Sequence, residues 1–175
     1  MLKSPSGSFI NAVGLFAVAI GAMACDTTVT NSAAAPKAGN MVNQSLQVES
    51  RDGKVLVHYT IDNQSPNVVH VPVSIAEDDQ LFASLFVITD SATGKPLEYT
   101  GPMVKRGPIT ADDFLAVKPK TKHGNTIDIT NSYAFRQGTH SYRLAYEGQY
   151  LDDVRNLEKV TPAALAPVQF SHTVK

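Results

Sequence analysis

Residues 46–61 read LQVESRDGKVLVHYTI, and this stretch decides the fold. Apolar and polar residues alternate before the turn, and after it every second residue from Val55 to Ile61 is apolar. Alternation with a period of two places the apolar side chains on one face of a strand. Asp52-Gly53 between the two runs is a strong hairpin signal. The stretch therefore predicts two antiparallel strands that share one buried face.

Similar short runs recur downstream, at residues 69–73, 85–89, 127–129, 142–146 and 168–174. Turn-forming residues separate them, as in NQSPN and SATG. This spacing predicts an all-β chain, an immunoglobulin-like antiparallel β-sandwich of about seven strands. Pro72 predicts an edge strand or a bulge within its run. Residues 76–83 and 151–159 are predicted as two short helices.

Residues 1–24 have the pattern of a secretory signal peptide. Lys3 is the only charged residue before Asp26, and residues 9–24 read FINAVGLFAVAIGAMA. At about 1.5 Å per residue, this run is too short to cross a hydrocarbon core about 30 Å thick. A cleaved leader therefore fits better than a membrane-spanning helix.

Cys25, the sole cysteine, directly follows the leader. Its position resembles the lipobox of bacterial lipoproteins, in which this thiol receives a lipid. The resemblance implies lipidation of Cys25 and a membrane anchor on the periplasmic side of the bacterial cell envelope. The alternative is that Ala22-Met23-Ala24 is an ordinary signal peptidase site. In that case the chain would be secreted with a free thiol.

The remaining residues divide into two parts. Residues 25–42 are rich in Thr, Ala, Ser and Asn and lack apolar periodicity. They cannot bury enough surface to offset the entropy of ordering, which predicts a flexible tether. Residues 43–175 have the length of one domain with a single core.

The composition excludes several classes of protein. The chain is 43% hydrophobic and 18% charged, as in ordinary globular domains, and its net charge is −1. The missing basic excess argues against a nucleic-acid partner. One cysteine excludes a disulfide within a single chain.

No catalytic or metal-binding motif is present. None of the five histidines belongs to an H-E-x-x-H motif, and G-x-S-x-G and phosphate-loop motifs are absent. We therefore predict no catalytic residue, no metal site and no cofactor. The acidic run at Glu77, Asp78 and Asp79 could supply oxygen ligands to calcium. The favoured interpretation of this run is a solvated acidic loop.

Residues 97–146 carry a family resemblance. The stretch resembles the N-terminal domain that precedes the catalytic domain in secreted zinc endopeptidases of the deuterolysin and peptidyl-Lys metalloendopeptidase group (aspzincins). The resemblance covers most of residues 45–147. Its most specific part consists of Tyr99, Gly101, Pro102, Val104, Lys105, Arg106, Asp112, Asp113 and Phe114.

The chain departs from that family in one respect. Aspzincins continue into a catalytic domain with H-E-x-x-H and G-T-x-x-D motifs, and neither occurs in these 175 residues. The resemblance therefore implies no proteolytic activity. It implies the role of the N-terminal domain, which assists folding of the enzyme and blocks its cleft. The expected partner is a zinc metalloendopeptidase.

The expected contact surface is the loop that carries the specific part of the resemblance, residues 99–114. Its glycines and prolines argue against a regular strand, and Lys105 could enter a specificity pocket of the partner. Alternatively, the two cations form ion pairs within the loop and only hold it in place, Lys105 and Arg106 with Asp112 and Asp113. A different class of function also stays open, a structural or adhesion module of the envelope with no protease partner, because the fold alone does not determine function.

Overall fold

A computed structural model describes residues 31–32 and 41–175 of the chain. The first layer of the fold is a sheet in which β2 (Val42–Arg51), β3 (Lys54–Asn63) and β7 (Thr121–Asp128) are neighbours. The short β1 (Asn31–Ser32) adds to its edge beside β2. The turn between β2 and β3 has positive φ angles of 52° at Asp52 and 75° at Gly53. This geometry suits a two-residue hairpin, so the predicted hairpin is confirmed.

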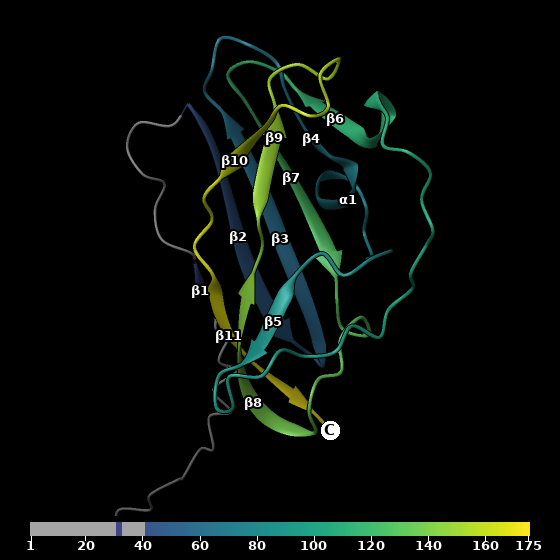
Figure 1. Cartoon of the computed structure of the whole chain (residues 1–175). Helices are drawn as coiled ribbons and strands as arrows, with labels where there is room; N and C mark the ends of the chain where they lie inside the picture. The colour runs from purple at the N-terminus through teal and green to yellow at the C-terminus, as the bar shows by residue number, and fades with distance from the viewer. Residues whose placement is uncertain (1–30, 33–40) are drawn as a thin grey trace, which may run out of the picture.

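The second layer consists of two shorter sheets. One has the order β10 (Val160–Ala163), β9 (Gly148–Leu151), β4 (Val69–Pro72), β6 (Phe114–Val117). The other has the order β11 (Val168–Val174), β8 (Gly138–Ala145), β5 (Val87–Asp90). All their strand pairs are antiparallel. In Figure 1 the first of these sheets lies above the second, so that β9 continues β8 and β10 leads into β11.

The predicted all-β antiparallel sandwich is confirmed, and the order of its strands can be compared with that of an immunoglobulin domain. The layer β2-β3-β7 faces a layer in which β8 and β9 lie between β10 and β11 on one side and β4 and β5 on the other. In immunoglobulin terms these are strands A, B and E facing G, F and C. The Tyr142 hydroxyl on β8 accepts a hydrogen bond of 3.1 Å from the Arg136 N–H, as in the tyrosine corner of such folds. The described chain has eleven strands instead of about seven, partly because interruptions split several of them.

The core lies between the layers. Val55, Val57, Tyr59 and Ile61 on β3 are all at most 1% exposed, which confirms the predicted buried face. From the opposite layer, Ile88, Tyr142, Leu144 and Phe170 are buried against this cluster. Phe135 packs edge-on against Tyr142 and Phe170, with ring centroids 5.2 and 6.2 Å apart.

The predicted helix at residues 76–83 is wrong. Near this segment the structure has a single α-helical turn, α1 (Val73–Ala76), which ends where that prediction begins. Side chains of β7 form hydrogen bonds with the backbone carbonyls at the end of this turn. The Asn125 amide donates to the Ile75 and Asp78 carbonyls at 3.1 and 2.7 Å, and the His123 ring bonds the Ala76 carbonyl at 2.7 Å. Tertiary contacts with a distant strand therefore end the helix after one turn.

Two further local predictions are corrected. Residues 151–159 form no helix, because Leu151 is the last residue of β9 and turns lead from there to β10. Strand β4, which contains Pro72, is not an edge strand, because it lies between β9 and β6. Pro72 is the last residue of β4, and the pairing of β4 with β9 is confined to His70. The proline therefore removes no hydrogen bond from the β9 side of the ladder.

The predicted leader, residues 1–24, and Cys25 lie outside the described residues. Within the predicted tether, Asn31 and Ser32 pair with β2, and Val42 begins that strand. No helix in the part of the chain that the structure describes is long and apolar enough to cross a membrane.

Candidate functional site

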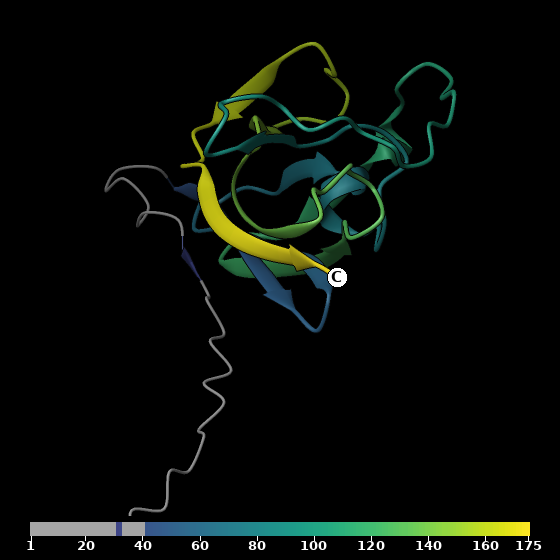
Figure 2. The ribbon, with the colours of Figure 1, turned by 90° about the horizontal axis from the view of Figure 1, so that it is seen from below.

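The 99–114 loop connects the segment after β5 to β6, and apart from the short 3₁₀ turn η1 (Ala111–Asp113) it is irregular up to Phe114. Its glycines and prolines predict this lack of regular structure. In Figure 2 the connection projects away from the two layers at the upper right. All nine residues that the sequence singles out lie on this one segment.

The start of the loop is fixed by Tyr99. Its ring packs edge-on against that of Tyr133 at 5.3 Å, and its hydroxyl donates to the carbonyls of Pro102 at 2.8 Å and Leu81 at 3.2 Å. Burial raises the pKa of the Tyr99 hydroxyl, which is consistent with its role as a protonated donor. A Cβ added at Gly101 would lie 2.7 Å from the Tyr99 hydroxyl oxygen, so a larger residue at position 101 would force the Tyr99 ring to shift.

Backbone hydrogen bonds tie the same part of the loop to its neighbours. The N–H groups of Thr100 and Gly101 donate to the Ser132 carbonyl at 2.9 and 3.2 Å. The Val104 N–H donates to the Phe82 carbonyl at 3.1 Å. The first half of the loop is therefore held from two sides.

The end of the loop is fixed by Asp113. Its carboxylate accepts hydrogen bonds from the Thr110 N–H at 2.8 Å and the Thr110 hydroxyl at 3.3 Å, which caps η1. The Arg106 guanidinium lies 3.9 Å from the same carboxylate and 3.6 Å from that of Asp78. Arg106 is about half-exposed, so these ion pairs position the loop more than they stabilise the fold.

The tip of the loop is Met103, Val104 and Lys105. Met103 is 80% exposed and Val104 is 55% exposed. Lys105 is exposed and forms no ion pair with any described residue. Of the pairing expected between the two cations and the two aspartates, only that of Arg106 with Asp113 is present. The tip of the loop therefore presents to solvent two apolar side chains and one cation without an ion pair among the described residues.

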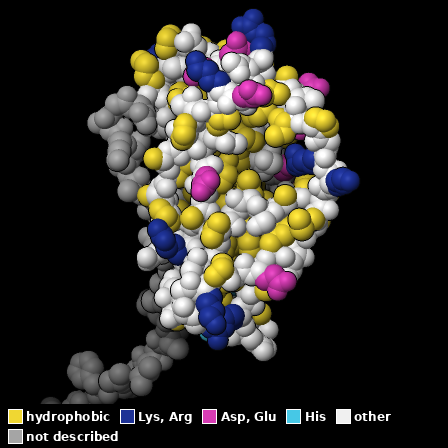
Figure 3. Space-filling view, viewed as in Figure 1, with side chains coloured by type: hydrophobic (Ala, Val, Ile, Leu, Met, Phe, Trp, Pro, Cys, Tyr) yellow, Lys and Arg dark blue, Asp and Glu magenta, His cyan; other side chains and the backbone are white. Residues whose placement is uncertain are grey.

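Beside the loop lies a cavity of about 600 Å³. Its walls include Leu81, Leu85 and Tyr146, and Arg106 and Phe114 join it from the loop. Figure 3 shows hydrophobic side chains gathered over this face around a hollow with charged side chains at its edge. No local sequence pattern marks this cavity, because its walls come from segments far apart in the chain.

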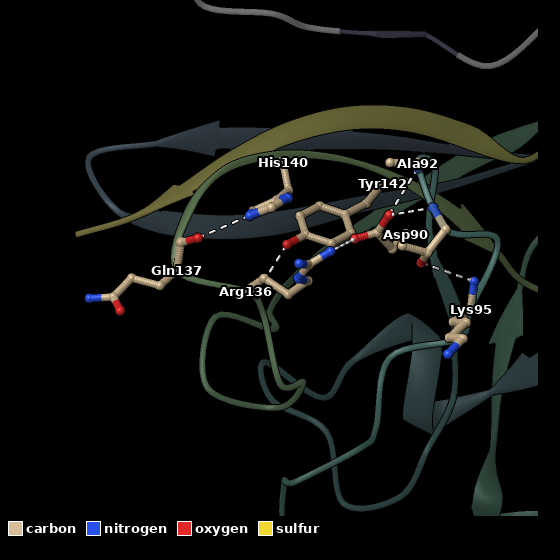
Figure 4. A network of polar contacts seen from close by, with 8 residues as sticks. Asp90, Ala92, Lys95, Arg136, Gln137, His140 and Tyr142 are labelled. Carbon is tan, nitrogen blue, oxygen red and sulfur yellow. Dashed lines mark hydrogen bonds and ion pairs between the residues drawn. The ribbon is translucent and has the colours of Figure 1, made fainter.

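A second polar cluster lies at the other end of the sandwich (Figure 4). The Asp90 carboxylate accepts hydrogen bonds from the N–H groups of Ala92 and Thr93, both at 2.9 Å, and pairs with the Arg136 guanidinium at 3.1 Å. The Thr93 N–H is the largest of several contacts that lower the pKa of Asp90. These contacts are internal and join the turn after β5 to the start of β8.

The histidines and acidic residues do not gather. Among residues 31–32 and 41–175, no group of three or more His, Cys, Asp or Glu side chains could hold a metal ion. His58 lies on the outer face of β3, and its ring forms hydrogen bonds with the Thr126 hydroxyl at 2.9 Å and the Glu49 carboxylate at 3.3 Å. Within the predicted acidic loop, Asp78 pairs with Arg106.

Comparisons with known proteins assign no family to the chain. No family model matches the chain, and no curated protein matches it.

Proposed function

We propose that this chain is a non-catalytic binding protein, and that it inserts the tip of the 99–114 loop into the cleft of a zinc endopeptidase of the deuterolysin and peptidyl-Lys group. The consequence is inhibition of the enzyme or assistance in its folding, the two roles of the pro-domain that the sequence resembles. One observation carries the proposal: Lys105, which is exposed and has no ion pair among the described residues, follows two exposed apolar residues on a loop that is anchored on both sides.

The anchoring matters because binding costs conformational entropy. A loop that is already held in one shape loses less freedom when it enters a cleft. Here the Tyr99 hydroxyl bonds and the Val104–Phe82 hydrogen bond hold one side, and the Thr110–Asp113 cap holds the other. Lys105 itself has no ion-pair partner among the described residues, so its charge is available to an acidic pocket.

The proposal extends to where the protein works. With a lipid on Cys25, the domain would stay at the periplasmic face of the envelope and meet the enzyme before export. The mass of the mature protein tests this. A diacylated N-terminal cysteine would support it, and an unmodified chain beginning at residue 25 would contradict it.

The test of inhibition is a titration. A zinc endopeptidase of this group from the producing organism is mixed with increasing amounts of the purified full-length chain, and its residual activity is measured. We expect a stoichiometric loss of activity that Lys105→Ala weakens by about tenfold or more, as for the anchor residue of an interface.

The matched control is Lys95→Ala, because Lys95 is exposed, makes no ion pair among the described residues and lies outside the loop. This variant should inhibit like the parent chain. Full enzyme activity at large excess, with no enhancement of enzyme refolding, would contradict the proposal. The chain would then be better described as a structural or adhesion module of the envelope.

A further inference from the structure

The cavity beside the 99–114 loop has the size and lining of a ligand site. Its volume of about 600 Å³ falls within the range of about 300–1,000 Å³ typical of small-molecule pockets. Two of its wall residues are strongly exposed, with Val87 at 61% and Ile109 at 68%. Covering these side chains would remove apolar surface from water, which favours an occupant with an apolar body.

The charges around the cavity are unbalanced. Asp78, Asp113 and Glu147 contribute three carboxylates to the lining, and Arg106 is its only cation. Arg106 is shared between Asp78 and Asp113. Glu147 is exposed and forms no ion pair among the described residues. The cavity therefore carries an excess of negative charge, with one carboxylate free to meet a partner.

We propose that this cavity binds a small amphipathic organic cation, a molecule with an apolar body and one ammonium or guanidinium group. The apolar body would lie against Leu81, Leu85 and Ile109, and the cation would pair with Glu147. An anionic ligand of the same shape would meet three carboxylates, and a neutral one would leave Glu147 unpaired. This inference goes beyond the proposed inhibition of an endopeptidase and does not depend on it.

The experiment is a titration of the ¹⁵N-labelled full-length chain followed by NMR. The probe is 4-phenylbutylammonium, and its neutral and anionic counterparts are 4-phenylbutanol and 4-phenylbutanoate. We expect saturable shifts confined to the segments that line the cavity, residues 72–74, 78–87, 106–114 and 146–149. The ammonium should bind about fivefold more tightly than the alcohol, the ratio that corresponds to one modest charge pair. The carboxylate should bind most weakly.

Two variants separate charge from shape. Glu147→Gln should weaken the ammonium about fivefold and leave the alcohol unchanged. Glu158→Gln is the matched control, because Glu158 is exposed, lies outside the 99–114 loop and does not line the cavity. Ala83→Phe should reduce binding of all three probes, since Ala83 is an exposed wall residue and a larger side chain there fills the space.

Three results would overturn the proposal: no saturable shift with the ammonium, equal affinity for the three probes, or shifts that map elsewhere on the domain. Equal weakening by Glu147→Gln and Glu158→Gln would also overturn it, because the effect would then come from net charge alone. The spectrum of each free variant shows whether it keeps the fold. If Ala83→Phe disrupts the fold, the Glu147→Gln comparison still decides.

Discussion

Three buried tyrosines test how hydrogen bonding stabilises this core. Tyr59, Tyr133 and Tyr142 are 1%, 4% and 0% exposed, so replacing each with phenylalanine removes one buried hydroxyl and little else. Their hydroxyls differ in the number of partners. That of Tyr133 donates to the Phe86 carbonyl at 2.7 Å and accepts from the Phe86 N–H at 3.1 Å. That of Tyr142 accepts one bond, and that of Tyr59 has no partner among the described residues.

The expected changes in the free energy of unfolding follow from these partners. Tyr133→Phe loses two hydrogen bonds and leaves the N–H and the carbonyl of the buried Phe86 without these partners. The free energy of unfolding should fall by about 2–3 kcal/mol. Tyr142→Phe loses one bond to the backbone of an exposed residue and should cost about 1 kcal/mol. Tyr59→Phe removes a hydroxyl that is buried without a bond and should stabilise the fold by about 1 kcal/mol. The raised pKa of Tyr59, caused mainly by burial, agrees with this environment.

The assay is urea unfolding of the three variants and the parent chain, followed by circular dichroism. With a slope of about 1–3 kcal/mol per molar urea, a loss of 2 kcal/mol moves the midpoint by about 1 M. The predicted order of midpoints is Tyr59→Phe, parent, Tyr142→Phe, Tyr133→Phe, with unchanged slopes. A Tyr59→Phe variant as unstable as Tyr133→Phe would refute the reasoning.

Three further predictions concern other parts of the domain. Tyr99→Phe removes the hydroxyl that bonds the Pro102 carbonyl within the loop. The Val104 N–H should therefore exchange with deuterium about fivefold faster, which corresponds to about 1 kcal/mol. An unchanged exchange rate would mean that the hydroxyl does not hold the loop. Gly148→Ala places a Cβ 2.9 Å from the Ala163 carbonyl oxygen and close to Leu165, so it should lower the melting temperature, at a cost of about 1–3 kcal/mol from overpacking. Burial lowers the pKa of His172, so the unfolded chain takes up its proton first as the pH falls. The contribution of His172 to the free energy of unfolding should therefore be fully present above about pH 6.5 and decline below it. The variant His172→Gln, whose side chain can keep a hydrogen bond to Ser50, should flatten this decline when urea unfolding is measured between pH 7 and 5.

The parts of the fold that sequence predicts well are those determined by neighbours in the chain. The β2–β3 hairpin follows from strict alternation and from Asp52-Gly53, both of which act over a few residues. The strand at residues 168–174 is likewise a local pattern and is present as β11. Glycine and proline in the 99–114 loop predict its irregular course for the same reason.

The parts that sequence missed depend on contacts across the fold. The helix that stops at Ala76 does so because Asn125 and His123, on another strand, bond the carbonyls at its end. Residues 151–159 end β9 and lead to β10 because those two strands pair, which no periodicity within the segment reveals.

The candidate site divides in the same way. Its residues on the 99–114 loop lie close together in the sequence, so a local sequence motif could predict them as one group. The ion pair of Arg106 with Asp78 joins two positions that share no local pattern, so the sequence alone could not predict it. The assignment of the nine loop residues to partner binding stays a prediction, as does that of Cys25 to lipidation.

The most direct test of the binding proposal is a hydrogen-exchange footprint. The full-length chain is exchanged alone and with an inactivated zinc endopeptidase of the group, and the two rates are compared peptide by peptide. We predict protection concentrated in residues 99–114 and lost with Lys105→Ala. Unchanged exchange in this loop, with or without protection elsewhere, would contradict the account.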